Sequence, residues 1–166
     1  MERVHTVMDS PYEALTLVAT DGVLSGLYMT DQRHRPAQET FGARDERPFG
    51  EAIRQLEAYF REELREFDLE FRLHGTPFQR TVWDELLRIP YGETRTYGEL
   101  AEVLGRPGAS RAVGLANGKN PISVIVPCHR VVGANGSLTG YGGGLDRKQR
   151  LLAFESGRAA AADALF

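Results

Sequence analysis

Two patterns of hydrophobic and polar residues divide the stretch from residue 12 to residue 48. In residues 12–29, apolar runs lie on either side of Asp21-Gly22, a pair that is typical of a tight hairpin turn. This pattern predicts two β-strands that are joined at the turn. Residues 31–48 are polar, contain two prolines and show little periodicity, which indicates a loop.

The hydrophobic period changes after this loop. Residues 49–66 carry apolar side chains at helical spacing with charged residues between them, which predicts an amphipathic helix. Residues 67–73 then alternate strictly between apolar and charged side chains, as a half-buried strand does. Gly75-Thr76-Pro77 breaks this alternation, so we expect a domain boundary near residue 75.

The second half of the chain has mostly helical patterns. Thr76 is a candidate cap for a helix over residues 77–88. The apolar side chains of this helix, including Leu87, are expected to face inward. Thr96-Tyr97-Gly98-Glu99 is a capping box that opens a helix through residue 104. Small residues mark a third helix over residues 109–117. Two helices separated by a short Gly/Pro turn give a helix-turn-helix outline, although many helical hairpins bind no DNA.

The last third of the chain combines a short apolar run, a glycine-rich loop and a helix. The apolar run 122–126 predicts a buried strand or extended segment that leads into Pro127-Cys128-His129-Arg130. The glycine-rich loop covers residues 133–144, and the final helix covers residues 145–154. Three basic residues are expected on the outer side of this helix: Arg147, Lys148 and Arg150.

The two halves of the chain differ in charge. Residues 1–75 hold 15 acidic and 9 basic residues, a net of −6, whereas residues 76–166 hold 8 acidic and 11 basic residues, a net of +3. We expect an α+β protein with domains over residues 1–75 and 76–157, followed by a flexible tail over residues 158–166. The basic half is the better candidate to bind a polyanion, although a solvated charged face gives the same counts.

Composition limits the chemistry that is available. The chain of 166 residues has a single cysteine, so no disulfide can form within it, and a zinc site built on several thiolates is excluded. No stretch approaches the apolar length of a membrane-spanning helix. The N-terminus lacks a charged start followed by an apolar run. We therefore expect a cytoplasmic protein that does not enter a membrane.

The single cysteine, Cys128, lies between Pro127 and His129. A lone cysteine is most often an inert, buried small hydrophobe. A reactive cysteine needs a neighbour that takes its proton, because the thiolate is the nucleophile. An imidazole does this best when a third group orients it, and Glu155 is the best acidic candidate for that part. The alternative for Glu155 is a surface charge at the end of a helix.

The residues around Cys128 resemble a known active-site signature. Residues 120–133, which read Asn-Pro-Ile-Ser-Val-Ile-Val-Pro-Cys-His-Arg-Val-Val-Gly, resemble that of the O6-alkylguanine-DNA alkyltransferases. Residues 140–145 resemble the active-site loop of that family, and Tyr97 with residues 111–114 resemble its DNA-binding helix pair. The resemblance covers about residues 10–157. It implies an N-terminal RNase-H-like α/β domain and a mostly helical, winged-helix-like C-terminal domain with a helix-turn-helix.

The resemblance implies a role for five residues in the chemistry. Cys128 is the nucleophile that accepts the alkyl group, His129 is the base that acts through a water, and Glu155 orients His129. Asn120 braces the turn around the cysteine, and Tyr97 donates a proton to the departing guanine.

The resemblance also implies residues that bind DNA and the damaged base. The DNA-binding residues are expected to be Tyr97, Arg111, Ala112 and Gly114, with Arg111 filling the space that the flipped nucleotide leaves. The base pocket is expected to use the carbonyl groups of Cys128 and Val131, the amide of Gly142 and the ring of Tyr141. Asp146 departs from the pattern, because bacterial relatives often carry a large aromatic residue there.

The function that the resemblance implies is DNA repair by direct reversal. One alkyl group moves irreversibly from O6-alkylguanine in double-stranded DNA to Cys128, with no cofactor and no metal, and we expect a monomer. Activity on O4-methylthymine, the preferred adduct size and cooperative binding along DNA stay open. One alternative is a non-catalytic alkyltransferase-like protein, but such proteins replace the cysteine. Another is a cysteine hydrolase, for which the sequence shows no oxyanion motif.

Overall fold

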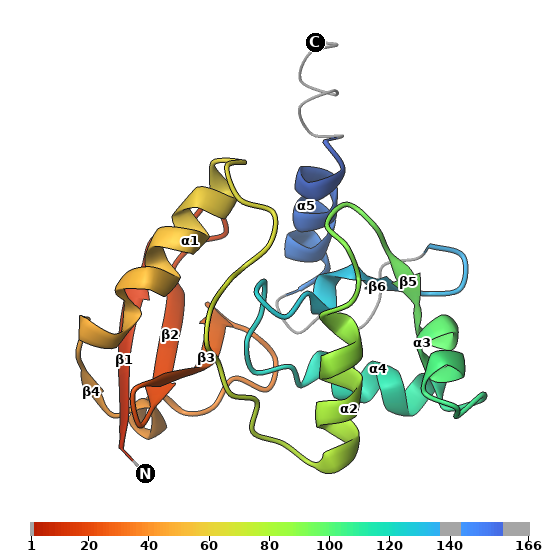
Figure 1. The fold of residues 1–166 in the computed structure, drawn as a ribbon, viewed down its shortest axis with the longest axis horizontal. Coiled ribbons are helices and arrows are strands. Elements are labelled where there is room, and N and C mark those ends of the chain that lie inside the picture. Colours follow the sequence, from red (N-terminus) through yellow and green to blue (C-terminus); the bar gives the residue numbers. More distant parts are fainter. Residues whose placement is uncertain (1, 137–143, 158–166) are drawn as a thin grey trace. The chain divides into compact units, whose positions relative to one another are not determined.

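The computed structural model describes residues 2–136 and 144–157. The chain divides into two compact units, whose elements can be followed in Figure 1. The first unit comprises Met1–His74 and Pro121–Ile125, and the second comprises Gly75–Asn120 and Val126–Phe166. Residues 121–125 thus group with the first unit, although the sequence places them inside the second half. The tail over residues 158–166 lies outside the described residues.

A four-stranded sheet forms the centre of the first unit. Its strands are β1 (Arg3–Met8), β2 (Leu15–Thr20), β3 (Val23–Met29) and β4 (Ala43–Arg44), in the order β3-β2-β1-β4. β4 pairs with β1 in parallel, and the other pairs are antiparallel. The predicted hairpin is confirmed: Asp21 and Gly22, with φ of 50° and 83°, connect β2 to β3. The sequence pattern had not indicated β1.

The predicted loop over residues 31–48 contains short regular elements. They are the 3₁₀ turns η1 (Gln38–Phe41) and η2 (Arg47–Phe49), together with β4. Phe41 and Phe49 from these turns are buried. The prediction was therefore incomplete, because two aromatic side chains enter the core of the first unit from this stretch.

The helix and strand predicted over residues 49–73 are only partly confirmed. Helix α1 covers Gly50–Phe60 and ends before the predicted residue 66, in a turn where Glu62 has a φ of 63°. The predicted strand over residues 67–73 is wrong, since only Phe71 makes a bridge, with Leu24. Burial does alternate along residues 67–73 as predicted. The pattern therefore reported which side chains face inward but not a ladder of backbone hydrogen bonds.

The second unit is mainly helical, as predicted. Its helices are α2 (Pro77–Leu86), α3 (Tyr97–Val103), α4 (Ser110–Gly118) and α5 (Leu145–Ser156). Two short parallel strands, β5 (Arg95–Thr96) and β6 (Val131–Val132), and the 3₁₀ turn η3 (Cys128–Arg130) complete it. Both predicted caps are confirmed, because Thr76 and Thr96 each form a full capping box, with Gln79 and Glu99.

Helices α3 and α4 form the predicted helix-turn-helix, and α2 packs against α4. The indole nitrogen of Trp83 in α2 donates a hydrogen bond of 2.8 Å to the carbonyl oxygen of Ala116 in α4. Trp83 is only 2% exposed, so this bond fixes α4 within the core of the unit. Leu87 was predicted to face inward but is 41% exposed, because α2 ends at Leu86 and Leu87 is its C-terminal cap.

The apolar run before the cysteine is a buried turn instead of the predicted strand or extended segment. Ile122 makes a single parallel bridge with Leu27 of β3. The amide of Leu27 donates to the carbonyl of Pro121 at 2.8 Å, and the amide of Ser123 donates to the carbonyl of Leu27 at 3.2 Å. Val124 then has a φ of 70°, which is unusual for a β-branched residue, and the chain turns back.

Candidate active site

Cys128 begins the 3₁₀ turn η3 and is 4% exposed. Two asparagine side chains hold the backbone around it. Nδ2 of Asn120 donates to the carbonyl oxygen of Val126 at 2.8 Å, and Nδ2 of Asn117 donates to the carbonyl oxygen of Cys128 at 3.2 Å. The bond from Asn120 closes the base of the segment 121–125, since it joins the residues on either side. Asn120 therefore lies where the sequence predicted a brace.

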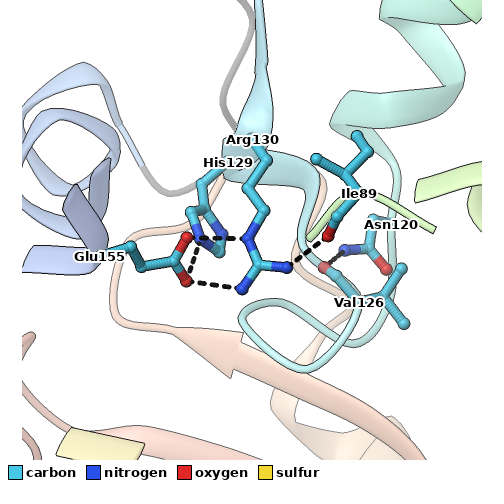
Figure 2. A network of polar contacts seen from close by, with 6 residues as sticks. All are labelled: Ile89, Asn120, Val126, His129, Arg130 and Glu155. Carbon is cyan, nitrogen blue, oxygen red and sulfur yellow. Dashed lines mark hydrogen bonds and ion pairs between the residues drawn. The ribbon is translucent and has the colours of Figure 1, made fainter. Parts of the chain in front are cut away.

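Figure 2 shows three charged or titratable side chains that meet: His129, Arg130 and Glu155. Nε2 of His129 lies 2.9 Å from Oε2 of Glu155, which reaches in from the end of α5. Arg130 donates to both oxygens of the same carboxylate, from Nε at 2.7 Å and from Nη2 at 2.8 Å. Its third bond runs from Nη1 to the carbonyl oxygen of Ile89 at 2.7 Å. Glu155 is 6% exposed, so it is not the surface charge considered as its alternative.

The two nitrogens of His129 have different surroundings. Nε2 faces the carboxylate of Glu155, whereas Nδ1 is buried and has no hydrogen-bond partner among the described residues. Because a carboxylate accepts hydrogen bonds, the proton of a neutral ring belongs on Nε2. The lone pair then belongs on Nδ1, which leaves this nitrogen able to accept a proton.

Burial and charge set the proton affinities of the site. Burial raises the pKa of Cys128 to about 11, although a hydrogen bond with Asn120 and the charge of Lys148 act to lower it. Burial lowers the pKa of His129, and the charges of Arg130 and Lys148 lower it further, whereas Glu155 acts to raise it. Burial acts to raise the pKa of Glu155, but His129 and Arg130 hold it well below its usual range. At neutral pH the site therefore contains a thiol, an ionised carboxylate and a histidine that resists protonation.

Lys148 is a second buried cation of the site. Its side chain is fully buried, its Nζ lies 5.8 Å from the centre of the Tyr97 ring, and it interacts electrostatically with Cys128. Burial lowers the pKa of Lys148 to about 8. The expected outer position is wrong for Lys148 and for Arg147, which is 9% exposed, whereas Arg150 is exposed as predicted. The buried face of α5 is instead formed by Arg147, Lys148, Leu151 and Glu155.

Tyr97 connects the site to the helix-turn-helix. It is the first residue of α3, and a Cβ atom added at Gly114 in α4 would lie 3.6 Å from its ring. A residue larger than glycine or alanine at position 114 would therefore press on Tyr97. Arg111 and Ala112 are exposed at the start of α4. The small face of α4 that the sequence showed thus serves in part to bring Tyr97 close.

The expected base-pocket residues are only partly covered by the structure. Val131 is fully buried and follows η3 directly. It lies opposite Arg95 in the parallel pairing of β6 with β5. Tyr141 and Gly142 lie outside the described residues. Asp146 is exposed in the first turn of α5.

Residues 2–136 and 144–157 contain no group of three or more His, Cys, Asp or Glu side chains that could hold a metal ion. Within the same part of the chain, no helix is long and apolar enough to cross a membrane.

Sequence reasoning missed three residues of the site: Asn117, Arg130 and Lys148. Arg130 lies within the signature around Cys128, but the sequence indicated no role for it. A charged residue inside the apolar stretch that runs to Val132 was a signal that it is buried and paired. Lys148 lies three residues before Leu151 and seven before Glu155, and this helical spacing placed it on the inward face.

The fold and the site together define a class: a two-unit protein in which a helix-turn-helix unit carries a buried cysteine beside a histidine and a glutamate. The protein-family model described as "6-O-methylguanine DNA methyltransferase, DNA binding domain" matches residues 77–157. A second family model, described as "6-O-methylguanine DNA methyltransferase, ribonuclease-like domain", matches residues 4–73. The chain belongs to the 6-O-methylguanine DNA methyltransferase family.

Individual relatives are similar over nearly the whole chain. A methylated-DNA–protein-cysteine methyltransferase of Mycolicibacterium paratuberculosis is 57% identical over 162 residues, which are 98% of each chain. One of Methanosarcina acetivorans is 49% identical over 151 residues, 91% of this chain and 97% of the relative. The solved structure of Mycobacterium tuberculosis OGT in complex with DNA is 55% identical, with a TM-score of 0.89 over 93% of this chain and 94% of that one. The two family matches and the solved structure confirm the α+β class with a ribonuclease-like first domain.

Proposed function

We propose that this chain repairs DNA by direct reversal, taking the alkyl group of O6-alkylguanine in double-stranded DNA onto its own Cys128. The observation that carries the proposal is the single buried cysteine next to a histidine whose other side is held by Glu155. Family membership supports it, because relatives over the whole chain are named methylated-DNA–protein-cysteine methyltransferases. The solved complex of the tuberculosis relative with DNA supports DNA as the partner.

The reaction that we infer is a displacement at the alkyl carbon. Cys128 gives its thiol proton, through a water, to Nδ1 of His129, whose lone pair is available there. The sulfur–carbon bond forms as the carbon–O6 bond breaks, and the electron pair moves to the guanine, which takes a proton from Tyr97. A thioether has no bond that water readily cleaves. Each chain therefore acts once and is consumed.

A base in the thiol's neighbourhood is needed because of burial. With the pKa of Cys128 raised to about 11, only a very small share of the thiol ionises by itself at neutral pH. Asn120 supports the reaction by fixing the turn and by its hydrogen bond to the thiol, which favours the charged form. Glu155 supports it by holding the ring of His129 in one orientation.

We infer that α4 enters the minor groove with its small residues, Ala112 and Gly114, and that Arg111 fills the space of the extruded nucleotide. The target atom is shielded inside the duplex, so the nucleotide must leave the stack. A helix with small side chains can lie deep in a shallow groove and contact mostly backbone, which suits damage in any sequence. Val131, Tyr141 and Gly142 are proposed to line the pocket for the flipped base.

We propose that residues 1–75 act as a scaffold and that residues 76–157 bind DNA and accept the alkyl group. The protein works as a monomer in the cytoplasm, with neither a cofactor nor a metal.

Counting repaired bases tests the proposed function. A duplex that carries one O6-methylguanine is incubated in excess over the protein, and guanine restored in the strand is measured. We expect restoration to stop at one guanine per chain, and no methanol to appear. Continued turnover with release of methanol would mean a hydrolase, and binding without restored guanine would mean a non-catalytic damage sensor. Either result would overturn the proposal.

A further inference from the structure

The carboxylate of Glu155 presents a problem for a proton-accepting histidine. A buried carboxylate next to an imidazole favours the charged imidazolium, because opposite charges attract strongly where water is excluded. An imidazolium has no lone pair and cannot take a proton from a thiol. A glutamate that acted alone on His129 would therefore orient the ring but would also tend to fill its proton site in advance.

Arg130 changes this balance through its geometry. It makes two hydrogen bonds to Glu155, at 2.7 and 2.8 Å, while His129 makes a single contact at 2.9 Å. A guanidinium stays protonated in proteins, and its flat fork matches a carboxylate. Arg130 is 6% exposed, so solvent screens this pair little. The negative charge of Glu155 is thus already matched before His129 contributes.

A second part of the fold holds Arg130 in this position. Its Nη1 donates to the carbonyl oxygen of Ile89 at 2.7 Å, and its guanidinium lies 5.7 Å from the centre of the Tyr91 ring. Both contacts come from the segment after α2, so Arg130 keeps its place without help from His129. The orientation of the guanidinium is shown in Figure 2.

We propose that Arg130 is a positioning residue of the transfer reaction: it neutralises Glu155, so that the carboxylate orients His129 while the ring stays uncharged and able to accept the proton of Cys128. This role rests on the proposed function of the site. The charged or titratable groups that act on His129 are Glu155 and Lys148 from α5 and Arg130 from η3. Two cations and one anion together disfavour a third positive charge on the ring.

The state of the His129 ring can be measured in the unmodified protein without DNA. Nitrogen-15 chemical shifts of a histidine-labelled sample distinguish an imidazolium from each neutral tautomer. At about pH 7 we expect a neutral ring with its proton on Nε2. An imidazolium at that pH in the wild-type protein would overturn the inference, whatever the protein does to DNA.

Two substitutions extend the test to the reaction. Arg130→Met should raise the pKa of His129, so that transfer at neutral pH slows by about tenfold or more and recovers toward alkaline pH. Arg130→Lys keeps the positive charge and should keep the ring neutral. Arg150→Met, which removes an exposed cation of α5, is the matched control and should leave the profile unchanged.

The outcomes separate this inference from the proposed function. A folded Arg130→Met protein with a wild-type pH profile and a neutral ring would contradict the role of Arg130. If Arg130→Met does not fold, the wild-type and Arg130→Lys spectra decide, and an imidazolium at about pH 7 in either contradicts it. A neutral wild-type ring in a protein that never takes up a methyl group would instead refute the proposed function.

Discussion

Glu155 has two partners that need it in different ways. For His129 it fixes the ring, and for Arg130 it is the counter-ion of a buried guanidinium. A substitution at position 155 takes the carboxylate away from both partners. It therefore affects the orientation of His129 and also leaves the buried guanidinium of Arg130 without its counter-ion. Kinetic and stability effects must therefore be measured together at this residue.

Glu155→Gln should slow transfer by about 10²–10⁴-fold, the range typical of lost general-base catalysis. The amide keeps the shape of the side chain but holds the tautomer of His129 less firmly. The loss should shrink at alkaline pH, where solvent ionises the thiol without help. Single-turnover rates against pH, with thermal melting as the control, check this. Wild-type rates at every pH in a protein that melts normally would remove Glu155 from the reaction.

Lys148 should assist the thiol through its charge. Lys148→Met is expected to raise the pKa of Cys128 further above about 11, because a cation that stabilises the thiolate is lost. Alkylation by iodoacetamide reports on this residue alone, since the chain has a single cysteine. We expect about tenfold slower alkylation at a given pH for each unit of pKa gained. An unchanged rate in a folded variant would show that the charge of Lys148 does not act on Cys128.

Helices α3 and α4 are positioned by local and by distant interactions. The capping box of Thr96 and Glu99 fixes the start of α3 and with it Tyr97. The bond from Trp83 to Ala116 fixes α4. Exposed Arg111 lies on this rigid support at the first turn of α4, where a binding side chain needs little rearrangement.

Arg111→Ala should slow repair in duplex DNA by about tenfold or more but leave the reaction with free O6-benzylguanine nearly unchanged. Only the duplex requires the vacated space to be filled. Lys119→Ala, which removes an exposed cation from the end of the same helix, is the control and should affect duplex repair less. Equal losses on both substrates would place Arg111 in the chemistry or in the fold instead.

Elements with local signals were predictable from the sequence. The caps at Thr76 and Thr96 and the hairpin at Asp21-Gly22 depend on side chains within a few residues, and all three are confirmed. The strand expected over residues 67–73 and the strand or extended segment expected over residues 122–126 are wrong, because a strand also needs a partner. Each of these stretches makes only one bridge, to β3.

The chemistry of the site was predictable to a similar extent. Cys128 and His129 are adjacent in the chain, so their proximity is certain from the sequence. Glu155 comes 26 residues after His129, and only the fold brings its carboxylate to the ring. The helical spacing indicated an inward position for Lys148, but a basic residue in an amphipathic helix usually faces solvent. Burial of charge is decided by the tertiary structure, which the pattern does not contain.

At the scale of the whole molecule, the buried ionisable groups make stability depend on pH. Burial lowers the pKa of His129, so below the ordinary value of about 6.5 the unfolded chain binds a proton that the folded chain resists. Stability is therefore present above about pH 6.5 and is lost as the pH falls. Glu155, whose folded pKa is also lowered, adds a loss only below about pH 4.5.

Thermal melting against pH checks this assignment. We expect wild-type stability to fall by up to about 1.4 kcal/mol per pH unit between about pH 6.5 and pH 5 because of His129. His129→Gln should flatten this part of the curve and keep the decline at lower pH. Parallel curves for the two proteins would contradict a resistant, buried His129.

The most direct test of the whole account is where the alkyl group goes. The protein is incubated with duplex DNA that contains O6-methylguanine, digested, and its peptides are weighed, with Cys128→Ser treated in the same way. We expect the wild-type peptide that contains Cys128 to gain the mass of one CH2 group permanently, and the serine variant to bind DNA but gain nothing. A methyl group on another residue, or an unmodified Cys128 after the DNA has been repaired, would contradict the account.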